Sequence, residues 1–174
     1  MNFLPGVVFA TFVSVLFSSG GVNAKEYYIG GPVKQNDMEI VANYLIGVEM
    51  FPMQTGMQHG PDVIHVEADV HALADNSNGF GDGVWIPYLS IGYTLTKGGG
   101  EWKSSGVLKP MEAKDGPHYA IDVKMPGPGD YKLVYSFAPP AGAAFARHVD
   151  KETGVPEWWK PFTTEFIFHY PSTQ

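Results

Sequence analysis

The sequence contains no cysteine. This absence excludes disulfide bonds, cysteine nucleophiles and thiolate metal ligands, so the fold must be stable through its core, and a metal site must use His, Asp, Glu or Met. Charge is also absent from the start of the chain: residues 3–17 are almost wholly apolar, and the first charged residue is Lys25. Together with the small-residue pattern Val22-Asn23-Ala24, this predicts a signal peptide over residues 1–24, cleaved near Ala24.

Other classes are excluded by what the rest of the chain lacks. It has 11 basic and 18 acidic residues, and the resulting net charge of −7 argues against binding to nucleic acid. There is no Gly-x-Ser-x-Gly elbow, and no glycine-rich stretch leads from a strand into a helix, so serine hydrolase and nucleotide-binding chemistry lack support. The mature chain has no second long apolar run, which predicts no membrane span, and its length suits a single domain over residues 25–174.

What is present indicates an all-β fold. The chain has 21 glycines, 14 prolines and 14% aromatic residues, a composition typical of turn-rich β proteins. No repeat or strong helix is evident, and one long loop is expected at Ala138–Phe162. These features predict a β-sandwich of seven or eight strands, immunoglobulin-like or cupredoxin-like. The expected strands are Lys25–Ile29, Met38–Phe51, Val63–Leu73, Ile86–Thr96 paired as a hairpin with Val107–Met111, His118–Lys124, Tyr131–Phe137 and Thr163–Tyr170.

The most informative stretch runs from Val63 to His71 and alternates strictly. Apolar residues occupy one face of the predicted strand, and every residue on the other face is a potential metal ligand or acid–base group. Neighbours on that face are roughly 7 Å apart, so one adjacent pair could share a metal but all four could not. Either a solvated strand face or a metal site completed by ligands from elsewhere fits this pattern. The four polar residues are His65, Glu67, Asp69 and His71.

Three further stretches carry candidate ligands. Met111, Asp115 and His118 surround a Gly-Pro turn, and a thioether with imidazoles suits copper, especially Cu(I). The polar run Arg147–Glu152 lies in the long loop and, taken alone, is typical of a solvated turn. A looser methionine-rich group could be a copper-binding handle or a loop packed on the sandwich; its members are Met50, Met53, Met57 and His59.

Taken together, these segments resemble the periplasmic iron-transport-associated P19 family, which includes Tp34-like metal-binding proteins. The resemblance covers nearly all of the mature chain in order. It is carried by Ile64-His65-Val66-Glu67-Ala68-Asp69-Val70-His71-Ala72, Asn78-Gly79-Phe80-Gly81, Trp85-Ile86-Pro87-Tyr88-Leu89, Pro110-Met111, Asp115-Gly116-Pro117-His118-Tyr119, Arg147-His148-Val149-Asp150-Lys151-Glu152-Thr153-Gly154 and Trp159-Lys160-Pro161-Phe162.

The resemblance implies an immunoglobulin-like β-sandwich, a homodimer and a copper site near the subunit interface. The implied copper ligands are His65, Met111 and His118, with Glu67 beside them. Asp115 falls at the position of a nearby second-metal ligand. The last implied residue, His148, would complete the site from the partner subunit. The methionine-rich group is not part of the family pattern and is left out of the site.

The resemblance also implies a role. The expected protein is a non-enzymatic periplasmic copper- and iron-binding protein, in which manganese or zinc could stand in for iron. It would support iron uptake through an inner-membrane iron permease. Two alternatives remain: a periplasmic copper chaperone or copper-resistance protein, and a copper-dependent ferrous iron oxidase. The sequence shows no second copper centre for reducing oxygen.

Overall fold

The computed structural model describes residues 24–141 and 145–172. The predicted signal peptide lies outside the described residues except for Ala24, and it stays a prediction, as does the assignment of residues 25–174 to one domain. Within the described part of the chain, no helix has the length and apolar character needed to cross a membrane.

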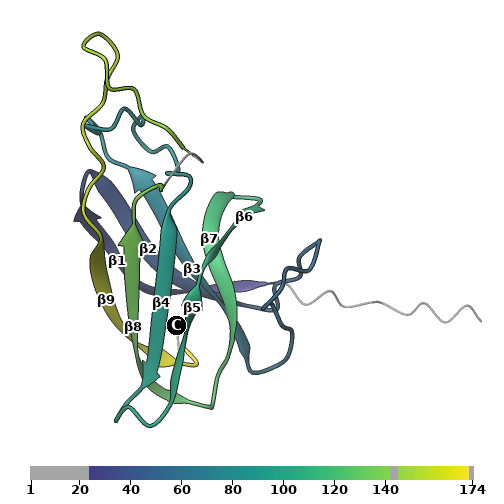
Figure 1. Cartoon of the computed structure of the whole chain (residues 1–174). Helices are drawn as coiled ribbons and strands as arrows, with labels where there is room; N and C mark the ends of the chain where they lie inside the picture. The colour runs from purple at the N-terminus through teal and green to yellow at the C-terminus, as the bar shows by residue number, and fades with distance from the viewer. Residues whose placement is uncertain (1–23, 142–144, 173–174) are drawn as a thin grey trace, which may run out of the picture.

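The fold consists of two antiparallel sheets that face each other as a β-sandwich, as expected from the sequence (Figure 1). One sheet has the strand order β1-β2-β3-β7-β6, and the other has the order β5-β4-β8-β9. The strands are β1 (Lys25–Gln35), β2 (Met38–Ile46), β3 (Val63–Ala72), β4 (Ser90–Lys97), β5 (Lys103–Val107), β6 (Lys109–Ala113), β7 (Gly116–Lys124), β8 (Gly129–Ala138) and β9 (Phe162–Tyr170).

The core lies between the sheets and is built by alternate residues of most strands. On β3 the apolar set is fully buried, and on β8 and β9 the aromatic and leucine positions face it. Successive side chains of a strand point to opposite faces of the sheet. When the apolar set is buried in the core, the remaining side chains therefore point out of the sandwich. The core residues of these strands are Ile64, Val66, Ala68, Val70, Tyr131, Leu133, Tyr135, Phe137, Phe166, Phe168 and Tyr170.

The first two strands end at other residues than the sequence predicts. The first strand does not end at Gly30. β1 continues to Gln35, and its pairing with β2 is irregular at two places, one on each side of Gly30. The second strand ends at Ile46 rather than Phe51, and residues 47–62 form a loop before β3. Gly47 has a φ of 80°, a left-handed conformation that glycine adopts without strain, so the strand stops there although β-prone residues follow.

The predicted hairpin between Ile86–Thr96 and Val107–Met111 is wrong in its second half. β4 pairs with β5, and the chain then passes into the other sheet, where β6 pairs with β7. Leu108, between β5 and β6, is buried, and its amide donates to the Ile91 carbonyl at 2.8 Å. Val107 and Met111 therefore belong to different sheets.

The outer face of β3 is covered by the loop of residues 47–62. Its backbone amide at Gln58 donates to Asp122 on β7 at 3.0 Å, and its carbonyl at Thr55 accepts from Lys109 on β6. His65 and Glu67 are only 3% and 7% exposed as a result. The prediction of a half-buried strand therefore fails at these two residues, because the sequence pattern does not show what packs over the polar face.

Candidate metal site

Three neighbouring strands bring the candidate ligands onto one face of the five-stranded sheet. Directly opposed residues of antiparallel strands point to the same side, and the register pairs His65 of β3 with Asp122 of β7. His118 lies four residues before Asp122 on the same strand and so shares this face. Met111 of β6 is paired with His118 and shares it too.

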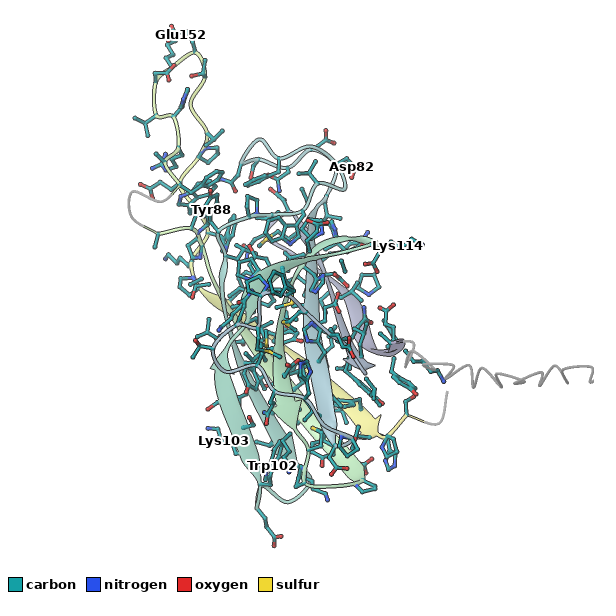
Figure 2. All side chains as sticks on the ribbon, turned by 90° about the vertical axis from the view of Figure 1, so that its right-hand side faces the viewer. Asp82, Tyr88, Trp102, Lys103, Lys114 and Glu152 are labelled. Carbon is teal, nitrogen blue, oxygen red and sulfur yellow. The ribbon has the colours of Figure 1, made fainter. Side chains whose placement is uncertain are left out.

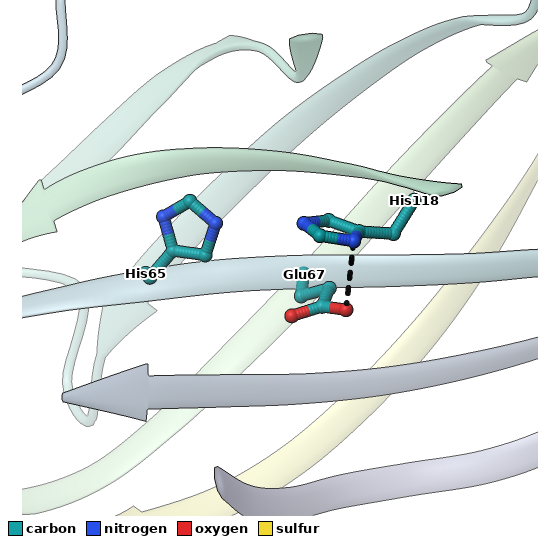
Figure 3. A group of neighbouring side chains, drawn as sticks. All are labelled: His65, Glu67 and His118. Carbon is teal, nitrogen blue, oxygen red and sulfur yellow. Dashed lines mark ion pairs between the residues drawn. The ribbon is translucent and has the colours of Figure 1, made fainter. Parts of the chain in front are cut away.

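The cluster at the centre of this face has the dimensions of a metal site. Single ligand atoms of His65, Glu67 and His118 all lie within 4.8 Å of one another, and all three residues are buried (Figure 3). Two ligands on opposite sides of an ion with bonds of about 2.0–2.2 Å are about 4.4 Å apart. Small side-chain adjustments would therefore place these atoms around one ion.

Two of the three side chains are already in contact, and the third lies beside them. His118 Nδ1 lies 3.5 Å from Glu67 Oε1, and the two imidazole rings are 6.0 Å apart in an edge-on arrangement. His118 Nδ1 also contacts the nearby Gly116 carbonyl, at 3.3 Å. The group is held by the two strands themselves.

Met111 adds a thioether to the same site. It lines a cavity of about 500 Å³ together with all three cluster residues. The other walls of the cavity come from the start of β1 and from the 47–62 loop, and include Glu26, Glu49, Met50 and Phe51. The donor set in the cavity thus comprises imidazole nitrogen, carboxylate oxygen and thioether sulfur.

Burial and neighbouring negative charge perturb the carboxylate. Desolvation, followed by the charges of Asp69, Glu26 and Asp115, raises the pKa of Glu67 to about 8. Burial likewise lowers the pKa of His118. Both shifts favour neutral groups in the metal-free site, and a cation that enters must displace the Glu67 proton.

The two outer members of the β3 row lie outside the group of three ligand atoms, although Asp69 is hydrogen-bonded to Glu67. Asp69 and His71 line a separate hollow of about 290 Å³, bordered by Asp115 and also by Glu67 and His118. Asp69 accepts a hydrogen bond of 3.1 Å from Asn43. The sequence predicts that one adjacent pair of the row could share a metal. His65 and Glu67 are an adjacent pair, and their ligand atoms lie within 4.8 Å of each other.

Asp115 and His148 lie at different places. Asp115 sits in the turn between β6 and β7 and borders both the 500 Å³ cavity and the 290 Å³ hollow. His148 belongs to the loop between β8 and β9, where its side chain is 74% exposed and its Nδ1 contacts Thr153 Oγ1 at 2.7 Å. This loop extends beyond the sheets, far from the β6–β7 turn marked by Lys114, with Glu152 near its tip (Figure 2).

Sequence reasoning missed one buried polar neighbour of the site. Asp122 Oδ1 lies 2.7 Å from His65 Nδ1, and both side chains are almost completely buried. The signal was present in the alternation of the strand, because Asp122 shares a face with His118.

The looser methionine-rich group is divided: Met50 borders the 500 Å³ cavity, His59 borders a second cavity of about 410 Å³ that also touches His65, and Met57 packs on the core.

Comparison with known families places this site in context. Residues 23–172 match the family described as Fe2+ transport protein. The chain belongs to the Fe2+ transport protein family. The predicted resemblance to P19 and its relatives is thereby confirmed.

Solved structures of similar proteins share the fold. A copper-bound variant of Campylobacter jejuni P19 is 41% identical, with a TM-score of 0.80 over 84% of this chain and 97% of that chain. A copper-bound variant of FetP from uropathogenic Escherichia coli is 47% identical, with a TM-score of 0.80 over 84% of this chain and 98% of that chain. The 34 kDa membrane antigen of Treponema pallidum is 32% identical over 154 residues, which is 86% of this chain and 76% of the antigen.

Proposed function

We propose that this protein binds copper in the cavity formed by His65, Glu67, Met111 and His118, and that it supports iron uptake in the periplasm. The observation that carries the proposal is the convergence of two buried imidazoles and one buried carboxylate within 4.8 Å. Family membership and the copper-bound P19 and FetP structures support the same assignment.

The donor set suits copper in particular. Imidazole binds copper in both common oxidation states, and a thioether favours Cu(I). Met111 lies opposite His118 in the β6–β7 hairpin, so sulfur and nitrogen reach the cavity from adjacent strands. Without a cysteine in the chain, no thiolate competes for the metal. Copper bound here is the resident metal of the protein.

Iron is proposed as the cargo, bound on the carboxylate side of the same face. Hard oxygen ligands suit iron, and manganese or zinc would serve as surrogate ions. Asp115 lies between the copper cavity and the hollow that contains Asp69 and His71. Glu67 borders both spaces. A second ion on this side would therefore be shared with, or lie next to, the copper ligands.

We further propose a homodimer in which His148 of one subunit completes the copper site of the other. Within a single chain, His148 is not among the described residues that line the 500 Å³ cavity. Its loop extends past the sandwich and presents the imidazole to solvent, which is the arrangement that a ligand donated to a second subunit requires. The cavity itself opens on the outer face of the sheet, where a second subunit could approach.

Export, localisation and partner follow from the same proposal. A signal peptide over residues 1–24 would deliver the mature chain to the periplasm. The negative charge of the protein, −7 overall, suits the capture of cations. The proposed recipient of iron is an inner-membrane iron permease, which would take the ion from this carrier. No catalytic turnover is required for this role.

The decisive experiment joins metal analysis to growth. The exported, purified protein is titrated with copper and with Fe(II) or Mn(II), and a deletion strain is complemented with the wild-type gene or with His118→Ala under iron limitation. We expect copper binding by the wild type and loss of growth rescue by the variant.

Normal iron-limited growth of the deletion strain, combined with sensitivity to excess copper, would instead assign a copper chaperone or resistance role. Oxygen-dependent oxidation of Fe(II) by the copper-loaded protein would assign the oxidase role.

A further inference from the structure

Asp122 lies directly behind one of the candidate ligands. It is paired with His65 across the β3–β7 ladder, and its Oδ1 is 2.7 Å from His65 Nδ1. The side chains are 5% and 3% exposed, so the contact is largely shielded from bulk solvent. A carboxylate accepts hydrogen bonds but does not donate them, and the ring nitrogen facing Asp122 must therefore carry the hydrogen.

The second oxygen of Asp122 is also occupied. Oδ2 accepts a hydrogen bond of 3.0 Å from the backbone amide of Gln58, in the loop that covers the outer face of the sheet. One carboxylate thus connects an imidazole of the cluster with the covering loop. Gln58, Asp122 and His65 all line the 410 Å³ cavity next to the copper cavity.

We propose that Asp122 is a positioning residue that keeps the hydrogen of His65 on Nδ1, leaves Nε2 free as the metal ligand, and ties the covering loop to the orientation of that ring. The inference rests on the proposed metal site at His65. Histidines that bind metals usually donate their other ring N–H to a carboxylate or carbonyl, which fixes both the tautomer and the direction of the ring.

The substitution Asp122→Asn tests this assignment because an amide cannot replace both oxygens. If the oxygen of the new amide accepts from the Gln58 amide, the NH₂ group of the new side chain faces His65 Nδ1. Nδ1 must then accept a hydrogen bond, so the ring hydrogen moves to Nε2, where the metal would bind. If its oxygen accepts from His65, its NH₂ group faces the Gln58 amide, and the loop loses its hydrogen bond. We expect copper affinity to fall by about 10–100-fold, the usual loss when an outer-shell partner is removed.

A matched control is available on the other sheet. His169 Nδ1 and Asp130 Oδ1 form the same type of contact at 2.8 Å between β8 and β9, with side chains that are 56% and 78% exposed. Asp130→Asn therefore makes the same chemical change to a His–Asp pair outside the site, and its copper affinity should equal that of the wild type.

Two measurements on the metal-free protein are independent of copper. The ¹⁵N resonances of His65 should show the Nδ1–H tautomer in the wild type and in Asp130→Asn. In Asp122→Asn they should show the Nε2–H tautomer, or the Gln58 amide should exchange faster with solvent. If the wild type binds no copper, the proposed function fails while these two measurements still test Asp122. An unchanged tautomer, unchanged exchange at Gln58 and a copper affinity within threefold of wild type in Asp122→Asn would overturn the inference.

Discussion

The hydroxyl of Tyr135 donates a hydrogen bond of 2.8 Å to the backbone carbonyl of Glu67. Tyr135 belongs to β8 in the four-stranded sheet, and Glu67 belongs to β3 in the five-stranded sheet. The bond therefore crosses the core and fixes β3 at the residue whose side chain, on the opposite face, lines the 500 Å³ cavity. Burial raises the pKa of Tyr135 well above its usual value, so the hydroxyl keeps its proton.

Tyr135→Phe should lower the free energy of unfolding by about 0.5–1.5 kcal/mol, the net value of one buried hydrogen bond. Copper affinity should change little, because the Glu67 side chain keeps its place on the outer face. Denaturant unfolding and copper titration measure the two effects. Tyr88→Phe is the matched control, since Tyr88 is 56% exposed and its stability should remain within about 0.5 kcal/mol of wild type. A stability loss in the control as large as that in Tyr135→Phe would contradict this account.

His118→Ala should abolish high-affinity copper binding while the fold remains intact. The substitution removes an imidazole that lies beside Glu67 and opposite Met111. We expect a loss greater than the roughly 100-fold that follows removal of an outer-shell partner. Copper titration measures the affinity, and circular dichroism checks the fold. His169→Ala, which removes an exposed imidazole on the other sheet, should bind copper normally. Unchanged stoichiometry and affinity in His118→Ala would remove His118 from the site.

Glu67 makes the stability of the metal-free protein depend on pH. Its pKa is raised from 4.5 to about 8 in the folded state. Between these values the folded protein holds a proton that the unfolded chain has released, so the contribution of Glu67 to stability is greatest below pH 4.5 and is lost as pH rises towards 8. This group alone should contribute a fall of about 1.4 kcal/mol per pH unit in that window.

Glu67→Gln should abolish this contribution and flatten the pH dependence between about pH 6.5 and 8. His118, whose pKa burial lowers, contributes a slope of the opposite sign near the lower limit, and this contribution is common to wild type and variant. Chemical denaturation of the apo protein at several pH values measures the slopes. The same variant should lose more affinity for Fe(II) or Mn(II) than for Cu(I), because hard cations depend more on a carboxylate. Equal slopes in wild type and variant would mean that Glu67 is ionised in the folded apo protein.

Copper should strengthen the proposed dimer through His148. A ligand stabilises whichever state binds it better, and at 100 times the dissociation constant this linkage is worth about 2.7 kcal/mol per site if the monomer binds no metal. Sedimentation of apo and copper-loaded protein measures the shift in dimer dissociation. In His148→Ala the shift should vanish while weaker copper binding remains. Wild-type dimers that dissociate equally with and without copper would exclude a shared site.

Much of the sandwich could be predicted from the sequence because its strands alternate cleanly. Tyr131–Phe137 and Thr163–Tyr170 correspond closely to β8 and β9. The adjacent pair His65 and Glu67 follows from the same period of two. The approach of Met111 to His118 follows from the short turn between two β-prone stretches. These are local features, and local pattern predicts them well.

What could not be predicted depends on contacts between distant parts of the chain. The passage from one sheet to the other at Leu108 is a question of which strands pair, and alternation does not decide it. The burial of His65 comes from the 47–62 loop, whose docking uses Gln58 and Asp122. The role of His148 depends on a second subunit, so a single chain leaves it a proposal.

The spacing of the cluster along the chain has a consequence for how the protein is made. Glu67 and His118 are separated by about fifty residues, and they meet only after β3 and β7 have paired. An unfolded chain therefore contains no metal site, and binding free energy becomes available only once the sheet exists. A chain that crosses a membrane unfolded must leave its metal behind. On the proposed export route, loading would follow folding, and the metal content of the compartment in which the chain folds would decide which ion it first receives.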